Sequence, residues 1–123
     1  VVKLELTGLQ IWEALENGVS QVEQNSGRFP QVSGMSFTYN PKAKAGSRIK
    51  SVKVGNSPLN KGRTYTIATN DFLAKGGDGY TVFKKGKVII DASGATYLAN
   101  MVMNYIEAKG TVSPKVEGRI VAQ

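Results

Sequence analysis

Three glycines and an aspartate precede a tyrosine in the most unusual stretch of this sequence, which consists of Gly76, Gly77, Asp78, Gly79 and Tyr80. Glycine readily adopts positive φ angles and lets backbone N–H groups come close to a ligand. The stretch is not a phosphate-binding P-loop, because no Gly-Lys-Ser/Thr follows, and its spacing is not that of a dinucleotide-binding fingerprint. Two interpretations stay open: a loop that shapes a ligand site, or a tight connection in which Asp78 forms an Asx-turn.

Phe29 is the second candidate, an aromatic residue that lies between Arg28 and Pro30 in a polar loop. Pro30 restricts the backbone of the residue before it, so the ring can be held outward as a stacking platform. Alternatively, the ring folds back over the sheet as a plug. Phe29 and Tyr80 together could clamp a flat ring. Stacking a base on an aromatic side chain contributes about 1–3 kcal/mol, enough to orient a nucleoside but too little to select tightly among bases.

The composition excludes most hydrolytic and redox chemistry for this chain acting alone. Its 123 residues contain no His and no Cys. They therefore offer no imidazole base, no Ser-His-Asp triad, no thiolate nucleophile and no sulfur- or imidazole-ligated metal. The carboxylates of Asp71, Asp78 and Asp91 do not follow the Asp-x-Asp-x-Asp-Gly pattern of a calcium loop. We expect no catalytic residue and no metal site in this chain.

Positive charge is the third feature, with 16 Lys and Arg against 9 Asp and Glu and a net charge of +7. The basic residues gather in two windows, residues 42–53 and 84–87. Such clusters attract polyanions, or they are solvated strand faces with few acidic neighbours. The first interpretation would make the chain a stand-alone basic module that binds nucleic acid or another polyanion. No apolar run approaches the roughly 20 residues of a membrane span.

A single domain must position these candidates, because 123 residues leave no room for a second domain of ordinary size. Alternating apolar residues and β-formers predict strands at about 2–6, 31–39, 48–54, 64–69, 87–91 and 116–121. Residues 70–75 are predicted to form a short helical turn. Several neighbouring strands are joined by short turns, which favours an α+β fold with a mixed, largely antiparallel sheet and two main helices packed on it.

The first of these helices is expected to begin near Gly8, with Thr7 as its N-cap and Ile11, Leu15 and Val19 on its buried face. Gly18 weakens it by about 1 kcal/mol relative to Ala, which a close neighbour could explain. The second helix is expected over residues 95–109, capped by Ser93, ended by Gly110, and with five apolar residues on one side: Leu98, Met101, Val102, Tyr105 and Ile106.

Four segments, taken in order along the chain, together resemble the C-terminal domain of the 5′-nucleotidase family. They are residues 6–16 (LTGLQIWEALE), 27–34 (GRFPQVSG), 70–80 (NDFLAKGGDGY) and 116–120 (VEGRI). The pair formed by the second and third segments is the specific part of the resemblance. It implies a domain that binds the nucleoside half of a nucleotide and stacks the base between two aromatic residues. Phe29 and Tyr80 would be those aromatics, and the backbone of residues 76–79 would shape the pocket.

The family has a second, N-terminal metallophosphoesterase domain, which holds two metal ions and hydrolyses the phosphoester. The resemblance therefore implies two partners for this chain: a nucleotide or nucleoside ligand, and the N-terminal domain of the same protein. Divalent metal ions are expected there and not here. It also implies an inactive isolated chain, export of the parent to the periplasm, cell wall or exterior, and a ligand other than nucleic acid.

This sequence departs from the family pattern at two places. A Gly-Gly-Ile-Arg-type segment, which in the family supplies an Asn and an Arg to the substrate site, is not found before Val1. We therefore interpret residues 1–123 as one N-terminally truncated domain. A family carboxylate that can hold the ribose lies shortly after the second aromatic, but Phe83, Lys84 and Lys85 stand there. The ribose role is not assigned.

Overall fold

The computed structural model of the chain describes residues 1–91 and 97–123, so Ser93, the expected cap of the second long helix, lies outside the described residues. Its helices are α1 (Gly8–Val19), α2 (Asp71–Ala74) and α3 (Leu98–Lys109), with short 3₁₀ helices η1 (Val22–Gln24), η2 (Gly77–Gly79) and η3 (Thr81–Lys85). Its strands are β1 (Val2–Thr7), β2 (Met35–Tyr39), β3 (Ile49–Val54), β4 (Ser57–Pro58), β5 (Thr64–Thr69), β6 (Lys87–Ile90) and β7 (Ile120–Ala122).

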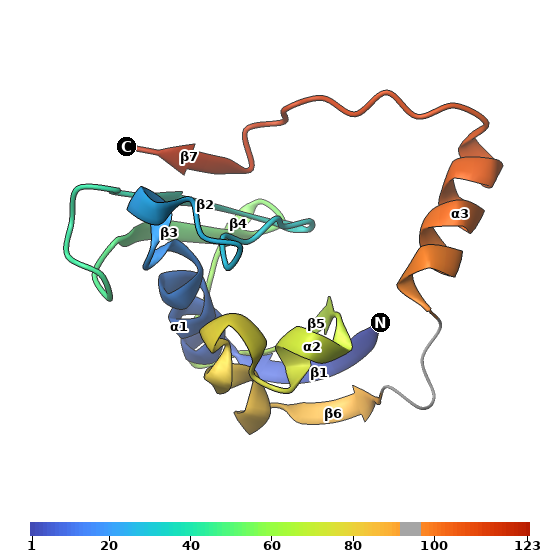
Figure 1. Ribbon diagram of the computed structural model, residues 1–123. Helices are drawn as coiled ribbons and strands as arrows, with labels where there is room; N and C mark the ends of the chain where they lie inside the picture. Colours follow the sequence, from blue (N-terminus) through green and yellow to red (C-terminus); the bar gives the residue numbers. More distant parts are fainter. Residues whose placement is uncertain (92–96) are drawn as a thin grey trace.

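The strands form two sheets, one of three strands in the order β5-β1-β6 and one of four in the order β4-β3-β2-β7 (Figure 1). Every described pairing is antiparallel except that of β2 with β7, which is parallel. The predicted α+β class and the largely antiparallel pairing are confirmed. Two sheets are present where one was expected, and residues 59–63 connect β4 of the second sheet to β5 of the first.

Helix α1 lies between the two sheets and closes the core (Figure 1). Ile11, Leu15 and Val19 are buried, as their four-residue spacing predicts. They meet the inward residues of β1, of which Leu4 and Leu6 are fully buried. Phe37 of β2 closes the core from the other sheet. Burial of each such side chain contributes about 1.5–3 kcal/mol, so α1 is anchored from both sides.

The two ends of α1 are fixed by polar contacts. The Thr7 hydroxyl accepts a hydrogen bond from the Gln10 backbone N–H at 3.2 Å, and the Gln10 side-chain oxygen accepts one from the Thr7 N–H at 2.9 Å. This capping box confirms Thr7 as the predicted N-cap. Near the other end, the Glu16 carboxylate accepts the backbone N–H groups of Arg48 and Ile49, at 2.9 and 3.1 Å. Glu16 thereby ties α1 to β3.

Arg48 belongs to this anchor and not to a free basic surface. It is 7% exposed, and its guanidinium donates to the Val19 carbonyl oxygen at 2.7 Å and to Glu23 Oε2 at 2.7 Å. The lysines of the same window, Lys42, Lys44, Lys50 and Lys53, are exposed. Four of the five basic residues that the sequence places in this window are therefore exposed, and the fifth, Arg48, is buried.

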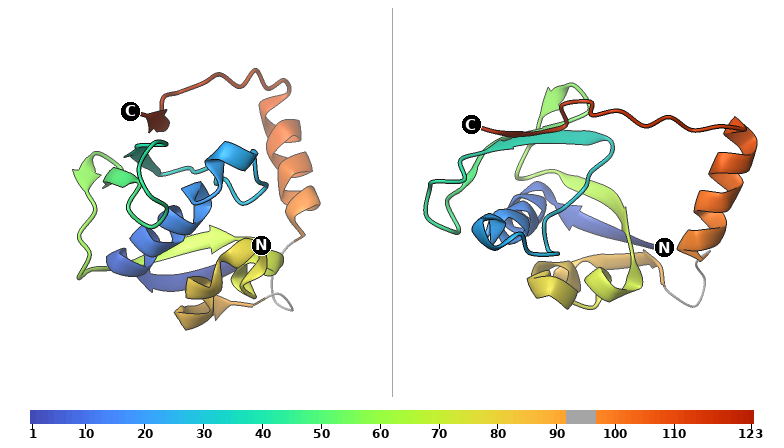
Figure 2. Two further views of the ribbon diagram at one scale, coloured as in Figure 1. Left: turned by 60° about the vertical axis from the view of Figure 1, so that its left-hand side comes forward. Right: turned by 45° about the horizontal axis from the view of Figure 1, so that its top comes forward.

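Helix α3 stands apart from the rest of the fold in every view (Figures 1 and 2). None of its residues is buried, and its apolar side remains 40–59% exposed. We call this side the α3 stripe; it consists of Leu98, Met101, Val102, Tyr105 and Ile106. Gly110 ends the helix at φ +80° with its N–H bonded to the Ile106 carbonyl, as predicted. The stripe was expected to pack on the sheet, but all five of its residues stay exposed.

Candidate functional site

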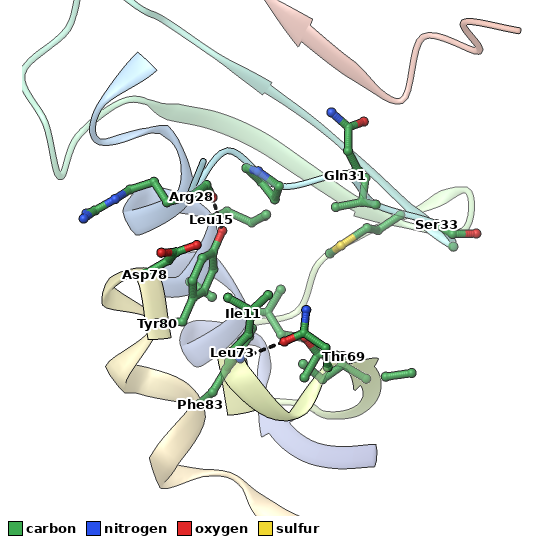
Figure 3. Close-up of a pocket in the computed structure, with 18 of the residues that line it drawn as sticks. Ile11, Leu15, Arg28, Gln31, Ser33, Thr69, Leu73, Asp78, Tyr80 and Phe83 are labelled. Atoms are coloured by element: carbon green, nitrogen blue, oxygen red, sulfur yellow. Dashed lines mark hydrogen bonds between the residues drawn. The ribbon is translucent and has the colours of Figure 1, made fainter. Parts of the chain in front are cut away.

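A pocket of about 860 Å³ opens beside α1, within the size range of small-molecule sites (Figure 3). One wall comes from Ile11, Ala14 and Leu15 of α1, and another from residues 65–70 of β5 and the segment after it. The loop of residues 27–35 and the segment that contains Asp78, Tyr80 and Phe83 complete it. Phe29, Asp78 and Tyr80, three of the predicted site residues, therefore share one cavity, whereas Gly76, Gly77 and Gly79 do not line it.

Tyr80 is held by its hydroxyl and by one ring face. The hydroxyl donates a 2.6 Å hydrogen bond to the Arg28 carbonyl oxygen, drawn as a dashed line in Figure 3. Its ring stacks on that of Phe83, with centroids 5.1 Å apart and planes inclined by 27°. The residue is only 4% exposed, and this burial, with the nearby Asp78 carboxylate, raises the pKa of Tyr80 to about 12. The hydroxyl is therefore a protonated donor at neutral pH.

Phe29 follows Arg28 directly and is half-buried. Its ring meets that of Tyr39 on β2 edge-on, with centroids 5.9 Å apart and planes inclined by 63°. The backbone N–H of Phe29 bonds to the Ser26 carbonyl oxygen at 3.3 Å. The ring thus packs on the second sheet, as the plug interpretation expects, and the residue also lines the pocket.

The glycines of residues 76–79 are required by backbone conformation and by close packing. Gly76 and Gly79 have φ angles of +92° and +79°, and Asp78 between them has φ +53°. A Cβ atom at Gly77 would lie 2.6 Å from the Phe72 ring, and one at Gly79 would lie 2.6 Å from Asn17 Oδ1. The segment forms the short helix η2, and α2 before it is capped by Asn70, whose side-chain oxygen accepts the Leu73 N–H at 2.8 Å.

Asn17 and Arg28 also belong to this site, although the sequence analysis assigned neither a role. Asn17 Nδ2 donates to the Asp78 carbonyl oxygen at 3.1 Å, and Asn17 Oδ1 accepts from Arg28 Nη1 at 3.2 Å. Gly18, next to Asn17, is explained by its neighbours, because a Cβ there would lie 2.7 Å from both Pro30 Cδ and the Tyr80 hydroxyl. The one signal in the sequence for this turn of α1 was Gly18, a glycine inside a helix that it weakens.

Neither a metal-binding group nor a membrane-spanning helix is present among the residues that the structure describes. Within residues 1–91 and 97–123, no three or more His, Cys, Asp or Glu side chains are grouped so that they could hold a metal ion. The described helices include none that is both long and apolar enough to cross a membrane. The lining of the pocket offers aromatic residues together with the polar groups of Arg28 and Asp78.

Comparison with known proteins identifies the fold and its relatives. The family model of the 5′-nucleotidase C-terminal domain matches residues 1–85. The trifunctional nucleotide phosphoesterase protein YfkN of Bacillus subtilis (strain 168) is 43% identical over 94% of this chain, and 5′-nucleotidase of Diplobatis ommata is 36% identical over 96% of it. The chain spans only 8% and 22% of these two relatives.

A solved structure shows the same arrangement of elements. The crystal structure of the 5′-nucleotidase precursor from Thermus thermophilus superposes with a TM-score of 0.91 at 40% identity, over 99% of this chain and 25% of that one. The match extends through nearly the whole chain. From the family match, the sequence relatives and this structure, we conclude that the chain belongs to the C-terminal domain of the 5′-nucleotidase family.

Proposed function

We propose that this chain is the nucleoside-recognition part of a 5′-nucleotidase-type nucleotide phosphoesterase and that the base binds in the pocket between Phe29 and Tyr80. One observation carries the proposal. The loop of Phe29 and the loop of Tyr80 line one cavity and are joined by the hydrogen bond from the Tyr80 hydroxyl to the Arg28 carbonyl oxygen. Two aromatic side chains held at fixed separation are suited to stack a flat heterocycle without reading its edge.

The two rings enter this proposal differently. Phe29 is half-buried, lines the pocket and has its ring edge-on to that of Tyr39. Tyr80 has one face against Phe83 and is 4% exposed, so only its other face is available to a base. We expect the base to stack on this free face of Tyr80, while the bonds from Asn17 to Asp78 and from Tyr80 to Arg28 keep residues 76–80 in place.

Hydrolysis is proposed to take place outside this chain, in an N-terminal metallophosphoesterase domain that carries divalent metal ions. The absence of His and Cys from the sequence is consistent with that division of labour. The lengths of the relatives also support it, since this chain matches no more than about a quarter of any of the three named above. The isolated chain is then a folded, inactive recognition module.

We also propose that the parent protein is exported, because its relatives include proteins named as venom and precursor proteins.

We also propose that residues 1–123 are one part of a larger domain, whose remainder covers the α3 stripe. An amphipathic helix in a stable protein buries its apolar side, and none of the residues on this helix is buried. The N-terminus lies beside the first residues of α3 in all three views (Figures 1 and 2). We therefore propose that polypeptide preceding Val1 covers the α3 stripe.

The test of base recognition uses the parent enzyme with Phe29→Ala and Tyr80→Ala. Each change removes one stacking surface worth about 1–3 kcal/mol, so KM for adenosine 5′-monophosphate should rise about 5- to 160-fold. Ribose 5-phosphate has no base, and its kcat/KM should not change. Tyr97→Ala is the control, because that aromatic is 80% exposed and is not part of the pocket. Unchanged KM for the nucleotide in both variants would contradict the proposal.

The alternative, a stand-alone module for polyanions, is favoured by the net charge of +7 and by the exposed lysines at positions 42, 44, 50, 53, 84, 85 and 87. It predicts that the isolated chain binds single-stranded DNA with an affinity that falls steeply with salt and does not depend on the base. Base recognition predicts the opposite: dependence on the nucleobase and little sensitivity to salt. Titration with adenosine and with an oligonucleotide at two salt concentrations separates the two.

A further inference from the structure

We propose that Asn17 is a positioning residue for base recognition, which sets the loops of Phe29 and Tyr80 at the separation that a base needs. The inference rests on the proposed function, since it concerns how the recognition pocket is held. Asn17 lies on α1 and is not one of the residues that line the pocket. It would act through Arg28 and Asp78, which do line it.

The side-chain amide of Asn17 bonds to both loops at once. Its Nδ2 donates to the Asp78 carbonyl oxygen at 3.1 Å, across 61 positions of sequence, and its Oδ1 accepts from Arg28 Nη1 at 3.2 Å. Only a side chain with a donor and an acceptor on one short, planar group can make both bonds from the same place on a helix. Aspartate lacks the donor, and leucine of similar size lacks both.

The backbone around Asn17 is shaped for close approach to the same two loops. A Cβ at Gly18 would lie 2.7 Å from Pro30 Cδ in the first loop and from the Tyr80 hydroxyl in the second. A Cβ at Gly79 would lie 2.6 Å from Asn17 Oδ1 itself. Gly18 on the helix and Gly79 in the second loop therefore lack a side chain where one would clash. This allows both loops to pack closely against this turn of α1.

Arg28 depends on this turn for its position. Its Nη1 bonds to Asn17 Oδ1 and to Ser20 Oγ, both at 3.2 Å, while its Nε is buried without a hydrogen-bond partner in the described part of the chain. The Ser20 hydroxyl in turn donates to the Asn17 carbonyl oxygen at 2.6 Å. The carbonyl oxygen of Arg28 also accepts the hydrogen bond from the Tyr80 hydroxyl, and Phe29 is the next residue in the chain. A shift of Arg28 therefore moves both candidate stacking residues.

The experiment compares Asn17→Ala with Glu16→Ala in the parent enzyme. Glu16 is the preceding residue on α1 and also makes two hydrogen bonds, but to the backbone N–H groups of Arg48 and Ile49, where β3 begins. It therefore serves as a matched control for a general loss of α1 anchoring. For Asn17→Ala, we expect KM for adenosine 5′-monophosphate to rise about 10-fold with kcat nearly unchanged, because the loss falls on binding geometry. Kinetics with ribose 5-phosphate should stay at the wild-type level.

Glu16→Ala is expected to lower thermal stability without this selective change in KM. Asn17→Asp provides a second variant of nearly the same shape, which keeps the acceptor toward Arg28 and loses the donor toward Asp78. It should raise KM for the nucleotide as Asn17→Ala does. If Phe29→Ala raises that KM while neither Asn17 variant does so, or if Glu16→Ala raises it equally, the positioning role is overturned and base recognition stands. If Phe29→Ala and Tyr80→Ala have no effect, both proposals are overturned.

Discussion

The hydroxyl of Tyr80 lies 2.6 Å from the carbonyl oxygen of Arg28, to which it donates a hydrogen bond. Arg28 is followed by Phe29, so this single contact couples the two aromatic residues that the sequence singles out. The two residues joined by the bond lie 52 positions apart. Arg28 also bonds to Asn17 of α1, and a Cβ at the next residue, Gly18, would lie 2.7 Å from the Tyr80 hydroxyl. The geometry of the pocket is therefore set by polar contacts to one helix turn as well as by apolar packing.

The first prediction concerns the removal of the Tyr80 hydroxyl. Tyr80→Phe keeps the ring on Phe83 but leaves the Arg28 carbonyl without its donor, which should lower the free energy of unfolding by about 1–3 kcal/mol. Urea unfolding followed by the fluorescence of Trp12, the single tryptophan, measures it. Tyr65→Phe is the matched control, because its hydroxyl accepts one bond, from the Asn60 N–H, at an exposed site. Equal losses in both variants would show that the Tyr80 contact has no special weight.

The second prediction concerns alkaline pH. Burial raises the pKa of Tyr80 to about 12, above its ordinary value of 10.0. Below pH 10 both the folded and the unfolded chain keep the proton, so stability does not depend on this group. Between pH 10 and about 12 only the unfolded chain releases it, and the free energy of unfolding should fall, by about 3 kcal/mol in total.

The measurement for this second prediction is the difference in unfolding free energy between the wild type and Tyr80→Phe from pH 9 to 12. Lysines and the other tyrosines are common to both proteins, so their titration largely cancels. The advantage of the wild type should shrink as pH rises through this window. A difference that stays constant would contradict the buried, protonated hydroxyl.

The third prediction separates the two reasons for glycine at position 79. Gly79→Ala places a side chain at φ +79° and pushes its Cβ against Asn17 Oδ1, whereas Gly46→Ala meets φ +92° with no atom within 4 Å of the new Cβ. The left-handed backbone alone costs about 1–2 kcal/mol. Gly46→Ala should lose that amount of stability, and Gly79→Ala should lose more. Equal losses would mean that Asn17 yields freely and does not hold this loop.

Local chemistry predicted much of the fold. Thr7 before an apolar repeat of four residues indicated a capped helix, and the structure shows the capping box and the buried face. Residues 64–69 alternate β-formers, and β5 has those bounds. The strand expected over 31–39 is shorter and begins at Met35, after Gly34 turns at φ +78°. The division into two sheets was not predicted, because periodicity carries no information on which strands pair.

The site was predicted only where residue type is distinctive. Phe29 and Tyr80 were recognisable because aromatic side chains in polar or glycine-rich loops need an explanation, and the structure places both on one pocket. Asn17 lies on a helix among solvated polar residues, so nothing in its type or spacing set it apart. Its two bonds depend on loops that arrive from 11 and 61 positions away. Contacts of that kind follow from tertiary structure and cannot be deduced from a local pattern.

The last prediction tests whether another part of the parent protein covers the α3 stripe. Val102→Asp puts a charge in the middle of the stripe, where the isolated chain leaves the side chain 47% exposed. In this chain alone the change should be nearly neutral, within about 0.5 kcal/mol, as for other surface substitutions. In the parent the same carboxylate would be buried without a partner. The melting temperature of the parent protein should therefore drop by several degrees. Asn104→Asp is the control, since it adds the same charge to the same helix outside the stripe. If both variants melt alike in the parent, α3 is solvated there and the stripe has no partner.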